Sequence, residues 1–160
     1  MPEITFPAPA EDFIPQRPPM RFVDEVLSAD ETGAVTRTTV RADSIAADAA
    51  GRLPAMALIE VMAQTIGVFA GRIHRLAGEG PRPGLLLGTR RMNLPVDSFA
   101  PGDVLRCTVE KAFESDEGLW QFKCAVDLLP QGDENAARPA GDAVLTVFNP
   151  PDGYFEKLAA

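Results

Sequence analysis

The sequence predicts an α+β domain in which one long helix is wrapped by a curved antiparallel sheet. The first observation is a helical apolar pattern around residues 53–71, and the second is a set of alternating, strand-like segments on both sides of it. The third is size, because 160 residues with 46% apolar content are enough for one domain with its own core.

The helix pattern begins at Pro54, a residue that is favoured in the first turn of a helix. Apolar residues then recur at spacings of three and four: Met56, Ile59, Met62, Ala63, Ile66, Phe69, Ala70 and Ile73. Leu58, Val61 and Val68 fall outside this stripe, so the helix is apolar on almost every side, as expected inside a core or a membrane. The uncharged run 61–71 is too short to cross a bilayer, which needs about 20 residues. We therefore expect a core helix from Pro54 to about Leu76 that ends at Gly78 or Gly80.

The other elements follow from alternation and from turn residues. We expect residues 1–12 to form a flexible arm and residues 13–160 to form a single domain. Strands are predicted at 21–29, 34–41, 84–96, 104–113, 119–129 and 142–148. The order is thus two strands, one long helix and four strands. A helix that is apolar all round needs a wall on nearly every side, and a second copy of the sheet completes that wall. This is the hot-dog architecture, expected as a dimer.

Composition excludes several classes of function. A net charge of −8 argues against nucleic acid as a partner, because such binding rests on a basic surface. The start of the chain does not resemble a secretory signal, so we expect a cytoplasmic protein without a membrane partner. Cys107 and Cys124 lie in alternating segments and are interpreted as reduced core thiols. With one histidine there is no zinc-binding spacing, and we expect neither metal nor cofactor.

Glu60 is the one ionisable residue within 53–71. It shares a flank of the helix with small and polar residues, namely Ala57, Gln64, Gly67 and Gly71. One interpretation is a structural carboxylate that pairs with an arginine or caps a backbone group. The other, which the apolar context favours, is a catalytic acid, because burial raises the pKa of a carboxylic acid. The N–H groups at the helix start, around Pro54, Ala55 and Met56, would polarise a carbonyl. Together these features suit chemistry on a thioester.

Two motifs, FIPQRPPMRFVDEVL (13–27) and LPAMALIEVMAQ (53–64), resemble the β-hydroxyacyl-acyl-carrier-protein dehydratases of the hot-dog superfamily. The chain is most similar to the dehydratase-like proteins of aryl-polyene clusters, and GLLLGTRRMNLPVDSFAPGDVL (84–105) resembles their following strand-turn-strand. The resemblance covers about residues 13–149. It implies a reaction that eliminates water from a 3-hydroxyacyl thioester on acyl carrier protein or coenzyme A.

The resemblance also implies a catalytic pair, a histidine in the first motif and a carboxylate on the helix, drawn from two subunits. The carboxylate falls on Glu60, but the histidine position holds Gln16, whose amide does not titrate. The chain also has DSIAADAAGRLPA (43–55) where fatty-acid dehydratases carry a Gly-His-Phe-Pro-Gly-like run. His74 lies about 21 Å further along the same helix and is a poor substitute.

Three hypotheses remain open. The first is an active dehydratase, in which Glu60 is the acid, Gln16 holds the substrate, and Pro54, Ala55, Met56, Gln64 and Gly67 line the binding site. The second is a partner subunit of a histidine-bearing dehydratase, in a heterodimer rather than a homodimer. The third is an acyl thioesterase that uses one carboxylate and an amide. Docking of an acidic carrier protein is predicted at Arg72, Arg75, Arg90 and Arg91, with Arg82 as a further candidate.

Overall fold

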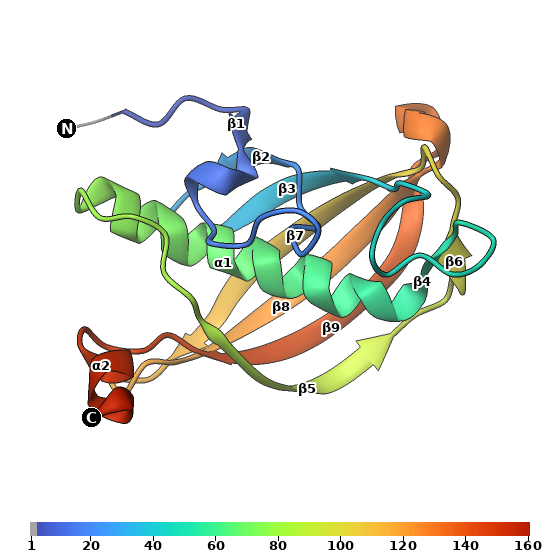
Figure 1. Ribbon diagram of the computed structural model, residues 1–160. Helices are drawn as coiled ribbons and strands as arrows, with labels where there is room; N and C mark the ends of the chain where they lie inside the picture. The colour runs from blue at the N-terminus through green and yellow to red at the C-terminus, as the bar shows by residue number, and fades with distance from the viewer. Residues whose placement is uncertain (1–2) are drawn as a thin grey trace.

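A seven-stranded antiparallel sheet curves around one long helix, α1 (Figure 1). The computed structural model describes residues 3–160. Across the sheet the strands follow the order β1-β2-β3-β7-β8-β9-β5, so β1 and β5 form its two edges. A separate two-stranded ribbon, β4-β6, lies at the beginning of the helix. The predicted α+β hot-dog fold is therefore confirmed.

The long elements occur in the predicted order of two strands, one helix and four strands. Their bounds are β2 Glu25–Ala29, β3 Gly33–Thr39, α1 Leu58–Leu76, β5 Leu85–Asn93, β7 Val104–Glu114, β8 Leu119–Leu129 and β9 Arg138–Phe148. Shorter elements are β1 Ala8–Pro9, β4 Leu53–Pro54, β6 Ser98–Phe99, the helix α2 Tyr154–Ala159, and 3-10 turns at Ala10–Asp12, Ala55–Ala57, Pro130–Gly132 and Glu134–Ala136.

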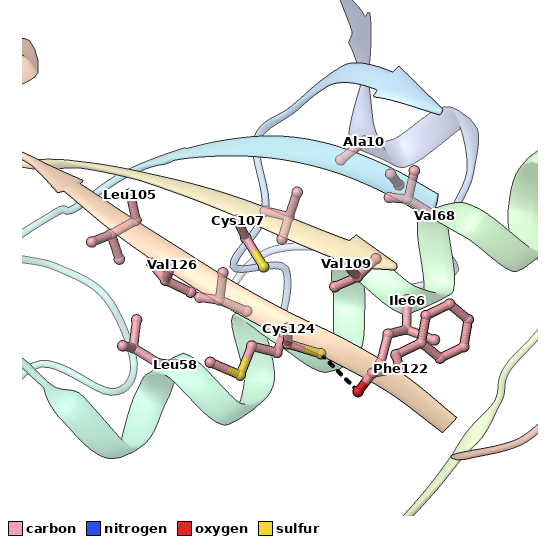
Figure 2. Packing of buried hydrophobic residues seen from close by; sticks show 14 of the residues in the cluster. Ala10, Leu58, Ile66, Val68, Leu105, Cys107, Val109, Phe122, Cys124 and Val126 are labelled. Carbon is pink, nitrogen blue, oxygen red and sulfur yellow. Dashed lines mark hydrogen bonds between the residues drawn. The ribbon is translucent and has the colours of Figure 1, made fainter. Parts of the chain in front are cut away.

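The core lies between α1 and the sheet. Phe69 of the helix contacts Trp120 and Phe122 of β8 edge to face, with ring centroids 5.5 and 5.3 Å apart. Cys107 and Cys124 are free thiols in the same core, as predicted (Figure 2). Segment Ala55–Leu76 is long and apolar enough to cross a membrane by length and composition. Here it is the core helix of the domain, which explains that composition.

The start of α1 differs from the prediction. Pro54 does not begin the helix: it has an extended backbone (φ −64°, ψ 149°) and pairs with Ser98 in the β4-β6 ribbon. A 3-10 turn follows, and the α-helix begins at Leu58. Met56, expected on the buried stripe, is 61% exposed in this turn. The end of the helix at Leu76 is as predicted, and Gly78 has the left-handed backbone (φ 78°) that commonly follows a helix.

The carboxyl-terminal part of the predicted arm, residues 8–12, belongs to the domain. Ala8 and Pro9 pair with Val26 and Glu25 of β2, and both Ala8 and Ala10 are buried. Residues 8–12 are therefore not a free arm, because edge pairing and apolar burial hold them against the sheet. Of the remaining predicted arm, residues 1 and 2 lie outside the described residues.

One flank of α1 and one edge of the sheet stay uncovered in the single chain. Ala63, Gly67 and Ala70 on the helix are only half-buried. Strand β5 lies at the sheet edge, where eight of its nine residues are exposed and one is intermediate. It includes three exposed leucines, Leu85, Leu86 and Leu87. The apolar flank of the helix and the open edge thus face the same side of the domain, beside the cavity described below.

Candidate functional site

Two glycines of α1 allow the segment that carries Gln16 to pass close to the helix. A Cβ atom at Gly71 would overlap the backbone carbonyl of Phe13, and one at Gly67 would lie 3.2 Å from the Ile14 side chain. At Gly71 only hydrogen leaves room for the segment, and at Gly67 a methyl group would press tightly on Ile14. The small helix flank noted in the sequence therefore accommodates a backbone of the same chain, and this contact fixes where Gln16 lies.

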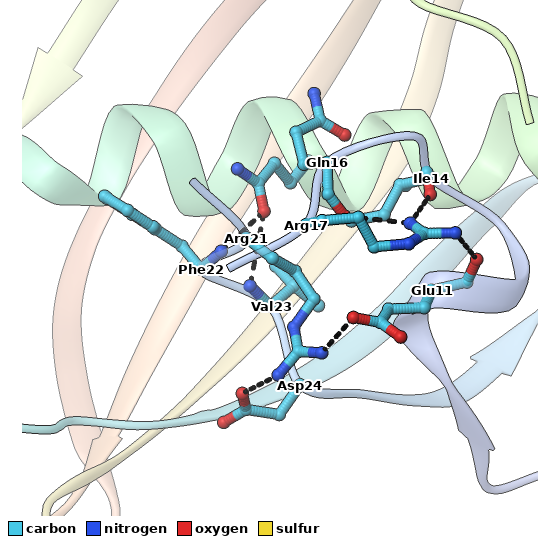
Figure 3. A network of polar contacts seen from close by, with 9 residues as sticks. Glu11, Ile14, Gln16, Arg17, Arg21, Phe22, Val23 and Asp24 are labelled. Atoms are coloured by element: carbon cyan, nitrogen blue, oxygen red, sulfur yellow. Dashed lines mark hydrogen bonds and ion pairs between the residues drawn. The ribbon is translucent and has the colours of Figure 1, made fainter. Parts of the chain in front are cut away.

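Gln64 joins this segment to Glu60. Its side chain is 2% exposed and uses both ends of the amide. The Oε1 atom accepts hydrogen bonds from the backbone N–H groups of Phe22 (2.8 Å) and Val23 (3.3 Å), which Figure 3 shows beside Gln16. The Nε2 atom donates to the Met20 carbonyl (2.8 Å) and to Glu60 Oε1 (2.8 Å). These bonds also explain why β2 begins at Glu25 and not at the predicted residue 21.

Glu60 is half-buried on the uncovered flank of α1. The hydrogen bond from Gln64 at the next turn holds one carboxylate oxygen in place. No arginine pairs with Glu60 within the described residues 3–160, so the structural alternative of an arginine pair does not apply. The result is an oriented carboxylate on an open helix face.

A cavity of about 260 Å³ brings the predicted pair together within one chain. Glu60, Gln16, Gln64 and Gly67 all line it. Sequence reasoning did not identify its apolar wall, which comes from β5, β8 and β9 and includes Leu85, Leu86, Trp120, Val147 and Phe148. Alternation alone places these residues on the inner or outer face of a strand. It cannot show which of them reach the helix flank. Arg82 also lines the cavity.

Gln16 contributes an unused hydrogen-bond acceptor. Its side-chain Oε1 is buried and has no partner among the described residues. Buried polar atoms nearly always have a partner, so an orphan in a cavity marks a position that a ligand or water fills. The Nε atom of Arg82 is a second buried polar atom without a partner in this part of the chain. The residues that line the cavity thus include one carboxylate, and Gln16 and Arg82 each add a buried polar atom that has no partner within residues 3–160.

The start of the helix does not contribute to this cavity. Pro54, Ala55 and Met56 are not among the residues that line it. The N–H of Ala55, expected to polarise a substrate carbonyl, donates to the backbone oxygen of Asp97 at 2.9 Å. The expectation that this N–H is free is therefore wrong, because the ribbon β4-β6 that precedes the helix already uses it.

The predicted docking arginines do not form one cluster. Arg75 pairs with Asp12 (3.2 Å) and lies over the ring of Phe13, near the carboxyl end of α1. Arg72, on the same part of the helix, lowers the pKa of Asp30, although hydrogen bonds from Thr32 are the main cause of that shift. Arg90 and Arg91 are exposed on β5, at the far edge of the sheet. A register shift between Thr89 and Arg91 also interrupts the alternation there.

His74 belongs to a separate polar cluster. Its Nδ1 lies 2.8 Å from Arg82 Nη2, and because arginine only donates, Nδ1 must accept. Burial, and secondly the charge of Arg82, lower the pKa of His74. Arg82 also pairs with Glu79 (3.3 Å) and with Asp152, so it ties the loop before β5 to the carboxyl end of the chain. His74 is not among the residues lining the Glu60 cavity.

The remaining nucleophilic and metal-binding groups are unsuited to catalysis. Burial raises the pKa of Cys107 to about 12 and also raises that of Cys124. Such thiols stay protonated near neutral pH and are poor nucleophiles. Within residues 3–160 no group of three or more histidine, cysteine, aspartate or glutamate side chains is arranged to hold a metal ion.

The fold defines a member of the hot-dog superfamily. Within it, the chain belongs to the ApeP-like family, described as ApeP dehydratase, whose model matches residues 8–159. Its function is therefore dehydratase-like, in agreement with the resemblance to the aryl-polyene proteins. Among curated proteins no match was found.

Several solved structures share the fold. A chain of the dehydratase heterocomplex ApeI:P from Xenorhabdus doucetiae is 24% identical, with 95% of this chain and 97% of that chain covered and a TM-score of 0.78. The hexameric thioesterase from Yersinia pestis is 19% identical, with 74% and 87% covered and a TM-score of 0.53. The PaaI protein of the E. coli phenylacetic acid degradation operon is 13% identical, with 78% and 81% covered and a TM-score of 0.56.

Proposed function

We propose that this protein is a cytoplasmic 3-hydroxyacyl-thioester dehydratase that acts on acyl chains attached to an acyl carrier protein. Family membership supports the reaction class. The observation that carries the assignment of residues is the cavity shared by Glu60 and Gln16, with Gln64 holding the carboxylate in position. The apolar wall around Trp120 and Phe148 suits an acyl chain.

Glu60 serves as both base and acid, because Gln16 cannot take a proton. The Glu60 carboxylate removes the C2 proton, and the electron pair of that bond forms the enolate of the thioester. The enolate then forms the C2=C3 double bond while the C3–O bond breaks. The leaving hydroxyl takes the same proton back from Glu60 and departs as water, which regenerates the carboxylate. C2 and C3 are adjacent, so one carboxylate can reach both groups.

Gln16 positions the substrate. Its buried, unpartnered Oε1 is an acceptor, and the 3-hydroxyl of the substrate is a donor. A bond between them would orient the hydroxyl and leave its oxygen lone pairs for protonation by Glu60. A substrate without the 3-hydroxyl would leave Oε1 unpaired, which gives the cavity a means of selecting hydroxylated acyl chains.

The test is a mass measurement of thioester products. Purified protein is incubated with 3-hydroxyacyl thioesters on carrier protein and on coenzyme A, and loss of water is followed. Glu60→Gln should lower the rate by at least about 10²-fold, the usual contribution of a general acid or base. Full activity in Glu60→Gln would contradict the assignment. Free thiol is measured in the same reactions, because a thioesterase releases thiol and a dehydratase does not.

Gln16→His tests whether the rest of the site is intact. A histidine there would supply the titrating base that the family pattern expects, so dehydration should rise by about 10²-fold or more. The matched control is Gln121→His, which places a histidine on β8 at a residue that does not line the cavity. An unchanged rate in Gln16→His would mean that position 16 does not face the reacting carbons.

A partner subunit is the second candidate function, and the uncovered edge supports it. Strand β5 and the half-buried flank of α1 leave apolar surface open beside the cavity. Pairing of β5 with the same edge of a second subunit would satisfy its free backbone groups and cover its leucines. We propose a dimer of this kind, with a related histidine-bearing dehydratase as partner when one is present. Co-expression of both chains followed by native mass spectrometry distinguishes the two forms: only homodimers would contradict the mixed assembly.

We propose that a carrier protein docks through the predicted arginines, which form two separate groups. Arg90 and Arg91 are exposed, while Arg72 and Arg75 lie at the end of α1. Reversal of charge in Arg90→Glu should weaken binding of an acyl carrier protein without unfolding the domain, and the effect should fade at high salt. Unchanged affinity for both Arg90→Glu and Arg72→Glu would remove these residues from the docking surface.

A further inference from the structure

A second cavity of about 180 Å³ lies on the other side of the segment that carries Gln16. Its walls come from residues 18–24, from β3 and the loop after it, and from Leu53 and Val61. It shares no lining residue with the cavity of Glu60. Neighbouring residues of α1 belong to different sites: Glu60 faces the first cavity and Val61 the second.

Two polar atoms at this cavity have no partner. Thr38 is 5% exposed, and its hydroxyl Oγ1 has no hydrogen bond among the described residues. Thr36, two residues earlier on the same face of β3, does have a partner, because its hydroxyl lies 2.8 Å from that of Thr65 and forms a hydrogen bond with it. The Nε of Arg21 is likewise buried without a partner in this part of the chain. Two buried polar atoms without partners, on residues that line the same cavity, indicate a position for a polar ligand atom.

The charges around the cavity indicate that this ligand atom is uncharged. The terminal nitrogens of Arg21 already pair with Glu11 (2.7 Å) and Asp24 (3.4 Å). Asp24 is itself satisfied by the N–H of Thr39 (2.8 Å). The guanidinium charge is thus balanced by carboxylates, and the other two charged residues of the lining, Arg41 and Asp43, have opposite signs. Because the charges of the lining cancel, a neutral oxygen that accepts from Nε–H and from the Thr38 hydroxyl suits the cavity better than an anion.

The cavity also has an apolar wall. Phe22, Val40, Leu53, Val61 and the exposed Ile45 form it, whereas Thr39 and Ser44 add polar groups elsewhere in the lining. An apolar cavity of about 150 Å³ is known to hold a benzene molecule, so a ring-sized group fits here. We propose that this cavity is a second binding site, which takes a ring-sized apolar group carrying one uncharged oxygen. The oxygen accepts hydrogen bonds from Arg21 and Thr38.

Phenol is the probe, and NMR of the ¹⁵N-labelled full chain is the measurement. Phenol should shift the amide signals of Thr38, Thr39 and Val40 in a saturable way. It should bind roughly 2- to 10-fold more tightly than benzene for each hydrogen bond gained. Benzoate should bind no more tightly than benzene, because the cavity lining carries as many carboxylates as guanidinium groups and so offers its carboxylate no net attraction. Absence of saturable shifts with phenol, as expected if the cavity holds only water, would overturn the proposal.

Thr38→Val keeps the shape of the side chain and removes the hydroxyl. The variant should bind phenol about 2- to 10-fold more weakly, the contribution of one hydrogen bond, while its affinity for benzene stays unchanged. Thr108→Val is the matched control, because Thr108 is exposed on β7 and does not line the cavity. Urea unfolding of both variants verifies that the fold persists. Equal affinity for phenol in Thr38→Val and in the wild type would overturn the role of the hydroxyl. No thioester enters this experiment, so its outcome is independent of dehydratase activity.

Discussion

Gln64 is the residue whose replacement tests the site and the fold together. Its amide makes four hydrogen bonds, two accepted and two donated, while only 2% of its surface is exposed. Gln64→Met preserves the approximate length of the side chain and removes all four bonds. The backbone N–H groups of Phe22 and Val23 then lose their acceptor, and the Glu60 carboxylate loses the donor that orients it.

The size of the effect follows from the groups left behind. A buried polar group that loses its partner costs about 1–3 kcal/mol. Val23 is fully buried and Phe22 is half-buried, so we expect Gln64→Met to lower the free energy of unfolding by about 2–5 kcal/mol. Dehydration should also slow, because both Glu60 and the segment that carries Gln16 lose their anchor. Urea unfolding followed by the fluorescence of Trp120 measures the first effect, and thioester turnover measures the second.

Gln64→Glu separates the accepted bonds from the donated ones. A carboxylate still accepts from Phe22 and Val23, but it cannot donate to Met20, and it lies against Glu60. Burial and the neighbouring negative charge raise the pKa of the introduced carboxyl above its unfolded value of about 4.3. The folded state then binds more protons than the unfolded chain. Stability is therefore greatest below about pH 4.3 and falls as the pH rises through the raised folded value.

Gln121→Met is the matched control for these variants. Its one side-chain contact, with Thr146 Oγ1, is long at 3.5 Å, so its replacement should change the free energy of unfolding by no more than about 0.5 kcal/mol. The reasoning is refuted if Gln64→Met unfolds at the same urea concentration as the Gln121 control. Relative to the wild type, the free energy of unfolding of Gln64→Glu should fall between pH 5 and pH 8. If it does not, the carboxyl groups at positions 60 and 64 are not close together.

Three further predictions follow from contacts of the core and of the helix end. Gly71→Ala should destabilise the protein by about 1–3 kcal/mol and slow dehydration, because the added methyl displaces the segment before β2. Gly80→Ala is the control: a Cβ atom there has nothing within 4 Å, so neither unfolding nor turnover should change. Because the pKa of His74 is lowered in the folded state, its contribution to stability is complete above about pH 6.5 and is lost as the pH falls toward the folded pKa. His74→Asn, with its free energy of unfolding measured at pH 7.5 and 5.5, should remove this pH dependence. An unchanged pH dependence would contradict the prediction. Cys107 and Cys124 should resist iodoacetamide in the native protein and react with it in urea, because burial raises the pKa of both thiols. Mass spectrometry counts the alkylated cysteines. Alkylation of the native protein would show that the thiols are accessible.

Local patterns predicted the elements but not all of their ends. The alternation of β7 and β8 and the periodicity of α1 are properties of neighbouring residues, so the strands and the helix could be predicted from sequence. The start of β2 could not, because the backbone N–H groups of Phe22 and Val23 donate to the Gln64 side chain and the Met20 carbonyl accepts from it, although Gln64 is more than 40 residues away. The strand β1 and the helix α2 are too short for a periodic signal. The start of α1 depends on the pairing of Pro54 with Ser98.

The sequence by itself determined the fold class, the central helix and the importance of Glu60, because one carboxylate in an apolar helix is visible without coordinates. It also identified Gln16 as the unusual residue of the family pattern. Only the tertiary structure decided what these residues contact. Gln64 holds Glu60, Gly71 admits the segment that carries Gln16, and the Ala55 N–H is already used. The last two facts are contacts between residues distant in the chain, and Gln64 itself is positioned by Phe22 and Val23, more than 40 residues away. Such contacts arise from packing, which no local pattern records.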